Sequence, residues 1–108
     1  MSVRDQMKAD LRRAMKERDK ATMTTLRSLL AAIDNAEAIP TQQDGPADLT
    51  FDKVDDVARK LLTEADIQAI LQKEHAERLA AMTNYEELGR GDIVAQLRVE
   101  VELIARYL

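Results

Sequence analysis

The residues that could carry acid–base, nucleophilic or metal chemistry are few in this chain, and their spacing does not suit it. His75 is the single histidine and cysteine is absent, which excludes an HExxH zinc site and thiolate metal sites. No nucleophile lies near His75, and no GxxxxGK or GxSxG motif occurs. The acidic pairs Asp55-Asp56 and Glu86-Glu87 are sequence neighbours, which point to different helix faces. We therefore predict no catalytic residue, no metal site and no cofactor.

Two residues of opposite charge, Glu74 and Arg78, lie within the apolar face of the long helix predicted after Thr63. At 100° per residue from Ile67, Glu74 and Arg78 lie close to the middle of that face, with Glu first, the favourable order for a helix pair. A charge that faces a core needs a partner, because removing it from water alone is costly. Two interpretations remain open: an ion pair that fixes how the helix packs, or a polar notch where a partner docks. Arg27 is predicted to join this polar cluster from another helix.

Basic residues recur every fourth position near the N-terminus. Lys8, Arg12 and Lys16 form a ridge of about 12 Å on one helix face, and we call these three residues the basic ridge. Residues 1–27 carry eight basic and four acidic side chains, which gives them a charge of +4. Because the net charge of the whole chain is −4, the remaining residues carry −8. The basic ridge is either an ordinary solvated face or a surface for two or three RNA phosphates. With three aromatic residues in the chain, we expect backbone contacts rather than base stacking.

The last predicted helix has two apolar faces. Val99, Leu103 and Tyr107 lie roughly opposite Val101 and Ile104, and a surface helix seldom needs two such faces. Either the helix is sandwiched between two layers of the domain, or Val99, Leu103 and Tyr107 contact another protein or a second copy of the chain.

These residues are expected to be positioned by one all-α domain. The 108 residues suit a single domain, and Gly, Pro and aromatic residues are scarce. We predict an antiparallel assembly of four to five helices over residues 1–108. Residues 1–38 form a helical hairpin, 39–50 a flexible loop, and 51–108 the remaining helices, including a short one near 52–61. Thr63, with Asp66 three residues later, is expected to begin the longest helix, and Gly89 is expected to end it. The absence of cysteine and of any 18-residue apolar run predicts a cytoplasmic protein without a membrane span.

An ordered set of short matches runs through nearly the whole chain. It comprises Met7-Lys8, Ala14-Met15-Lys16, Asp19-Lys20, Thr25-Leu26-Arg27, Leu29-Leu30, Ala32-Ile33, Asn35, Leu62-Thr63, Ile67, Leu71-Gln72-Lys73-Glu74, Arg78, Tyr85, Gly89-Arg90, Asp92, Glu102-Leu103 and Tyr107-Leu108. No single match is specific, but the set resembles the YqeY-like family. That family shares a helical domain with the B subunit (GatB) of the glutamyl/aspartyl-tRNA amidotransferase.

The resemblance implies a helical accessory module rather than an enzyme. In the B subunit, the helical domain and the small tail after it are linked to tRNA binding, whereas the chemistry belongs to other domains and subunits. The family label, carbon–nitrogen ligase with glutamine as amido-N-donor, is inherited by ancestry. Relatives usually continue past Tyr107-Leu108 into the tail, so we expect the tail domain to be absent. Val99, Leu103 and Tyr107 would then be the surface on which a tail packs.

Three functions follow from the sequence. The first is a tRNA- or RNA-associated module that uses the basic ridge. The second is a protein-interaction or homo-oligomerisation module that uses the last helix. The third, amide transfer, rests on the family label alone, because the sequence contains no group to stabilise its transition state.

Overall fold

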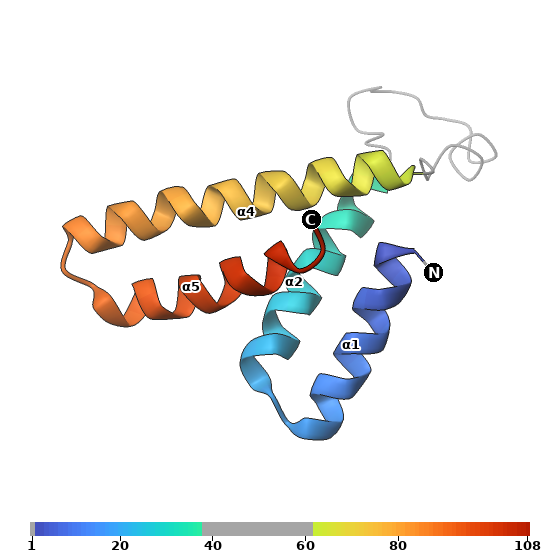
Figure 1. The fold of residues 1–108 in the computed structure, drawn as a ribbon, viewed down its shortest axis with the longest axis horizontal. Coiled ribbons are helices and arrows are strands. Elements are labelled where there is room, and N and C mark those ends of the chain that lie inside the picture. The colour runs from blue at the N-terminus through green and yellow to red at the C-terminus, as the bar shows by residue number, and fades with distance from the viewer. Residues whose placement is uncertain (1, 38–61) are drawn as a thin grey trace, which may run out of the picture.

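Two helical hairpins make up the part of the chain that the structure, a computed structural model, describes: residues 2–37 and 62–108. α1 (Val3–Glu17) and α2 (Lys20–Glu37) form the first hairpin, and α4 (Glu64–Glu87) and α5 (Gly91–Ala105) form the second. Figure 1 shows that the α4–α5 hairpin extends beyond α1 and α2 as an arm. These two ranges contain helices and no strand, which confirms the all-α prediction. The predicted loop at 39–50 and the short helix near 52–61 lie outside the described residues.

The helices begin where the sequence places capping residues. The Thr63 hydroxyl accepts a hydrogen bond from the Asp66 backbone N–H, and the Asp66 carboxylate accepts one from the Thr63 N–H, both at 3.0 Å. This reciprocal capping box opens α4. Ser2 caps α1, and Asp19 precedes α2, where its carboxylate accepts from the Thr22 side chain and backbone. Those two hydrogen bonds lower the pKa of Asp19.

Two residues in the left-handed region end the first helix of each hairpin. Gly89 has φ +73° after α4. Its N–H donates to the Glu86 carbonyl at 3.1 Å, and the Arg90 N–H donates to the Tyr85 carbonyl at 2.9 Å. This is the Schellman pattern for which glycine is preferred. Arg18 takes the same role after α1 with φ 59°, although a side chain is strained there.

The core lies where the two hairpins cross. α2 contacts α1 on one side and both α4 and α5 on the other. The buried side chains that pack together come from all four helices and the C-terminal residues: Met7, Leu26, Leu29, Ile33, Ile67, Leu71, Leu103, Ile104 and Tyr107. Beyond this crossing, the arm has only its own two helices to cover its apolar side chains, and Leu79 on α4 and Leu88 directly after α4 are exposed.

The apolar stripes of these helices are narrow and interrupted by charges. Within the described ranges no helix is long and apolar enough to cross a membrane.

Candidate nucleic-acid interface

The basic ridge lies along the solvent side of α1. Lys8, Arg12 and Lys16 are all exposed, whereas Met7 and Ala14 on the opposite side are buried. Because the three positions are four residues apart, the charges rise about 6 Å per step along the helix. Within the described ranges none of the three forms an ion pair. The ridge therefore carries positive charge that no carboxylate of residues 2–37 or 62–108 neutralises by an ion pair.

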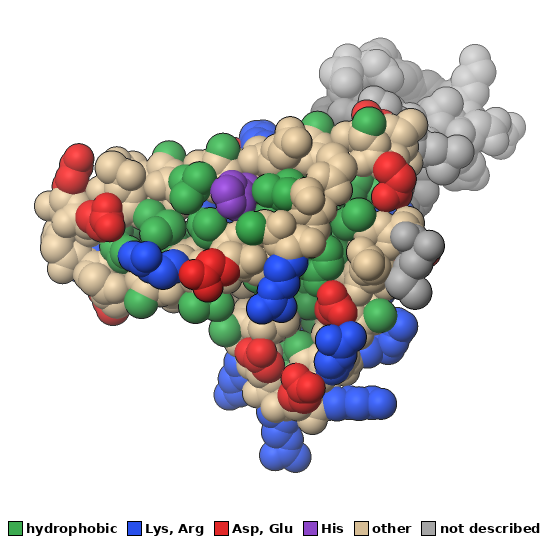
Figure 2. Space-filling model, in the orientation of Figure 1, with side chains coloured by type: hydrophobic (Ala, Val, Ile, Leu, Met, Phe, Trp, Pro, Cys, Tyr) green, Lys and Arg blue, Asp and Glu red, His purple; other side chains and the backbone are tan. Residues whose placement is uncertain are grey.

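The surroundings of the ridge are polar rather than apolar. On α1 the one large apolar side chain with substantial exposure is Met15, at 49%. Figure 2 shows Lys and Arg side chains projecting from the α1–α2 hairpin, including its turn, with Asp and Glu among them on the same face. The exposed positive charges of α1 are therefore separate from one another and surrounded by polar side chains, and proteins contact phosphate backbones with positive charges spaced in this way.

Arg78 joins α4 to α5 through an ion pair. The expected pair with Glu74 is present, with Arg78 Nη1 2.7 Å from Glu74 Oε1. Arg78 Nε also lies 2.8 Å from Oε1 of Glu100 on α5. Burial acts to lower the pKa of Arg78, but the hydrogen bonds to both carboxylates outweigh it and the pKa is raised. Arg78 thus links α4 to α5 through ion pairs, and its side chain is only 14% exposed.

Arg27, which the sequence placed in this cluster, forms no ion pair with Glu74 or Glu100. It is exposed on α2. The sequence interpretation missed Glu100, which supplies the second contact. The spacing of the sequence did indicate this residue, because Glu100 shares the helix face of Leu97, Val101 and Ile104. It is a charged residue within the apolar face of α5, as Glu74 and Arg78 are within that of α4.

The second apolar face of α5 is divided between core and surface. Leu103 is 5% exposed and Tyr107 8% exposed, and both pack in the core with Ile104. α5 is held here between α4 and α2, which is the sandwiched alternative. Leu103 and Tyr107 are therefore not available at the surface as a partner interface. Val99, at 48% exposure, remains open to solvent.

Tyr107 joins the C-terminal end to α1 and α4. Its hydroxyl donates a hydrogen bond to Asp10 Oδ2 on α1, and its carbonyl oxygen accepts one from Gln68 Nε2 at 2.7 Å. The other carboxylate oxygen of Asp10 accepts from Arg13 Nη2 at 3.1 Å. Burial and the hydrogen bond to Asp10 raise the pKa of Tyr107, so the hydroxyl keeps its proton. Sequence interpretation missed Asp10, although it too falls inside an apolar face, between Met7 and Ala14.

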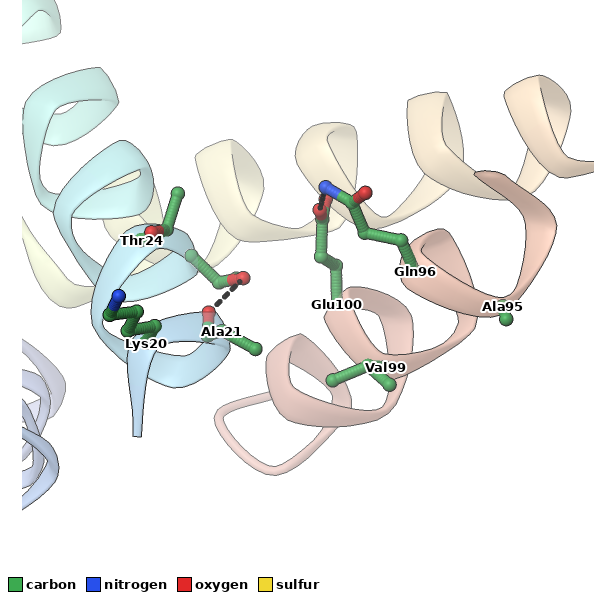
Figure 3. Close-up of a pocket in the computed structure, with 8 residues that line it drawn as sticks. Lys20, Ala21, Thr24, Ala95, Gln96, Val99 and Glu100 are labelled. Atoms are coloured by element: carbon green, nitrogen blue, oxygen red, sulfur yellow. Dashed lines mark hydrogen bonds between the residues drawn. The ribbon is translucent and has the colours of Figure 1, made fainter. Parts of the chain in front are cut away.

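A groove of about 490 Å³ lies between the start of α2 and the middle of α5. Figure 3 shows Lys20, Ala21 and Thr24 on the α2 side and Ala95, Gln96, Val99 and Glu100 on the α5 side. Most of its polar groups are already engaged. The Thr25 hydroxyl donates to the Ala21 carbonyl at 3.0 Å, and Gln96 donates to Glu100 at 3.4 Å.

His75 lies half-buried on α4. In the part of the chain that the structure describes, no three His, Asp or Glu side chains are grouped to hold a metal ion.

Comparison with known proteins identifies the family. The family model described as Yqey-like protein matches residues 4–108. The chain is also 31% identical, over 102 residues, to "Altered inheritance of mitochondria protein 41, mitochondrial" of Eremothecium gossypii. That match covers 94% of this chain but 46% of the relative, so the chain spans about half of the relative's length. A family model that matches nearly every residue shows membership directly, and the chain belongs to the YqeY-like family.

Proposed function

We propose that this chain is a non-catalytic helical accessory module that binds the sugar-phosphate backbone of RNA, with tRNA as the RNA. The observation that carries the proposal is the basic ridge, where Lys8, Arg12 and Lys16 are exposed without an ion pair among the described residues. Membership of the YqeY-like family supports it, because the family's helical domain is related to that of the amidotransferase B subunit.

The physical basis is release of counterions from the RNA. Each phosphate neutralised by Lys or Arg releases bound cations, so the logarithm of affinity falls with the logarithm of salt concentration by about 0.7–0.9 per contact. Three ridge contacts correspond to a slope of roughly 2–3. Between 50 and 200 mM salt, they account for a loss of affinity of about 20- to 40-fold.

The test is the binding of bulk tRNA to the full chain between 50 and 200 mM salt. The ridge variant carries Lys8→Glu, Arg12→Glu and Lys16→Glu. A control of equal charge carries Lys20→Glu, Arg27→Glu and Arg98→Glu, which replace exposed cations on α2 and α5. We expect the ridge variant to lose most of the affinity and of the salt dependence, and the control to keep most of both. Equal losses in the two variants would show that net charge alone acts, and the ridge would have no role.

A second candidate function is contact with another protein or a second copy through α5. Val99 is the observation that favours it, because it is 48% exposed and lines the groove between α2 and α5. Light scattering across concentration, for the wild type and Val99→Asp, tests this candidate. A mass that stays at one chain at every concentration would contradict self-association, and a mass that rises in both proteins would exclude Val99 from the contact.

A further inference from the structure

Two arginines from distant parts of the sequence flank the contact between Tyr107 and α1: one pairs with Asp10, and the other is the residue before Tyr107. Asp10 binds Arg13 with one carboxylate oxygen and the Tyr107 hydroxyl with the other. Arg106 directly precedes Tyr107, as the C-cap of α5. The hydrogen bonds of Tyr107 to Asp10 and Gln68 therefore place Arg106 one residue away from the contact with α1. We call Arg13 and Arg106 the junction arginines.

The junction arginines carry more positive charge than their surroundings neutralise. The Arg13 side chain is 65% exposed and uses one N–H on Asp10, which leaves further donors of its guanidinium free. Arg106 is exposed and forms no ion pair with a described residue. Both positive charges act on the Tyr107 hydroxyl, against the burial and the Asp10 contact that raise its pKa. The hydroxyl of Tyr107 thus lies in the field of two positive charges and of the one negative charge of Asp10.

The junction arginines continue the basic ridge around α1. Arg13 is three residues before Lys16 in the sequence, which places it about 60° around the helix and about 4.5 Å along it. This rotation brings Arg13 toward the side of α1 that carries Asp10, where Tyr107 makes its hydrogen bond. Arg13 therefore extends the positive charge of the ridge from the outer face of α1 toward the contact between Asp10 and Tyr107.

The geometry points to the junction arginines as a second phosphate-binding point for the same RNA backbone that the basic ridge contacts. This inference rests on the proposed function. An RNA is favoured over an anionic membrane, because the apolar face of α1 is buried at Met7 and Ala14 and cannot enter a lipid surface. A phosphate is a good ligand here, since a guanidinium presents paired donors that match two phosphate oxygens.

The experiment measures the affinity and salt slope of bulk tRNA for Arg106→Ala, Arg106→Lys and the matched control Arg98→Ala. Arg98 is also exposed, lies eight residues earlier in α5 and forms no ion pair with a described residue. We expect Arg106→Ala to lower the slope by about 0.7–0.9, which is about a threefold change between 50 and 200 mM salt. Arg106→Lys should restore the slope, and Arg98→Ala should leave it unchanged.

The ridge variant separates failure of this inference from failure of the proposed function. If the ridge variant loses binding while Arg106→Ala matches Arg98→Ala, the second contact is wrong and the proposed function stands. If the ridge variant binds like the wild type while Arg106→Ala lowers the salt slope, the proposed role of the basic ridge is wrong. The junction arginines are then supported as a phosphate site. Binding to phosphatidylserine vesicles without binding to tRNA would overturn the inference by assigning the charges to a membrane.

Discussion

Replacing Arg78 by methionine removes the charge that ties the two helices of the arm together. The methionine keeps much of the aliphatic length of arginine, so packing changes little and the charge is the main loss. Glu74 and Glu100 would then remain without a cation, although their side chains are only 22% and 17% exposed. Arg78→Met is therefore expected to destabilise the domain more than other arginine replacements on its surface.

The size of the effect follows from the burial of the three groups. Breaking a buried ion pair by removing one partner costs about 3–5 kcal/mol, whereas exposed pairs contribute about 1 kcal/mol or less. The Arg78 side chain is 14% exposed, so solvent screens part of the interaction. We expect the free energy of unfolding to fall by about 2–3 kcal/mol, which corresponds to a melting temperature lower by roughly 10–20 °C.

Urea and thermal unfolding, followed by circular dichroism, measure this change. The control is Arg98→Met, which removes an exposed cation from α5 and should alter stability by about 0.5 kcal/mol or less. A triple variant, Arg78→Met with Glu74→Gln and Glu100→Gln, removes the stranded charges and should recover most of the loss. The reasoning is refuted if Arg78→Met is as stable as Arg98→Met, or if the triple variant is no more stable than Arg78→Met alone.

Two other substitutions test the ends of the helices. Arg18→Gly should stabilise the domain by about 0.5–1 kcal/mol, because Arg18 has φ 59° and glycine takes that conformation without strain; an unchanged or lower urea midpoint would contradict this. Tyr107→Phe should alter the pH dependence of unfolding above the ordinary tyrosine pKa of 10.0. The raised pKa of folded Tyr107 means that its contribution is complete below pH 10 and is lost as pH rises toward the folded value. The wild type should therefore lose its stability advantage over Tyr107→Phe in strongly alkaline solution, and a constant difference across that range would refute the role of the hydroxyl.

The positions of the helix ends and of the exposed ridge were predictable because both depend on local chain geometry. Thr63 and Asp66 cap α4 through contacts three residues apart, and Gly89 ends it through its own backbone conformation. The ridge is exposed because a 3.6-residue period places Lys8, Arg12 and Lys16 opposite the stripe that α1 buries. None of these features requires knowledge of a neighbouring helix.

The partners of charges and apolar faces were decided by how the hairpins cross. Periodicity indicated that Arg78 needs a carboxylate, but the relative placement of α4 and α5 supplied Glu100, and Arg27 lies exposed on α2 instead. The same crossing buries Leu103 against the other helices and leaves Val99 exposed.

What the sequence by itself determined is therefore the all-α class, the helix boundaries capped by Thr63 and Gly89, and the exposure of the basic ridge. Only the tertiary structure decided that the Asp10 carboxylate accepts a hydrogen bond from Tyr107, the residue that follows Arg106. The physical reason is that helical periodicity specifies which face of each helix turns inward. It carries no information on the register at which two inward faces meet, because that register depends on the packing of side chains from both helices at once.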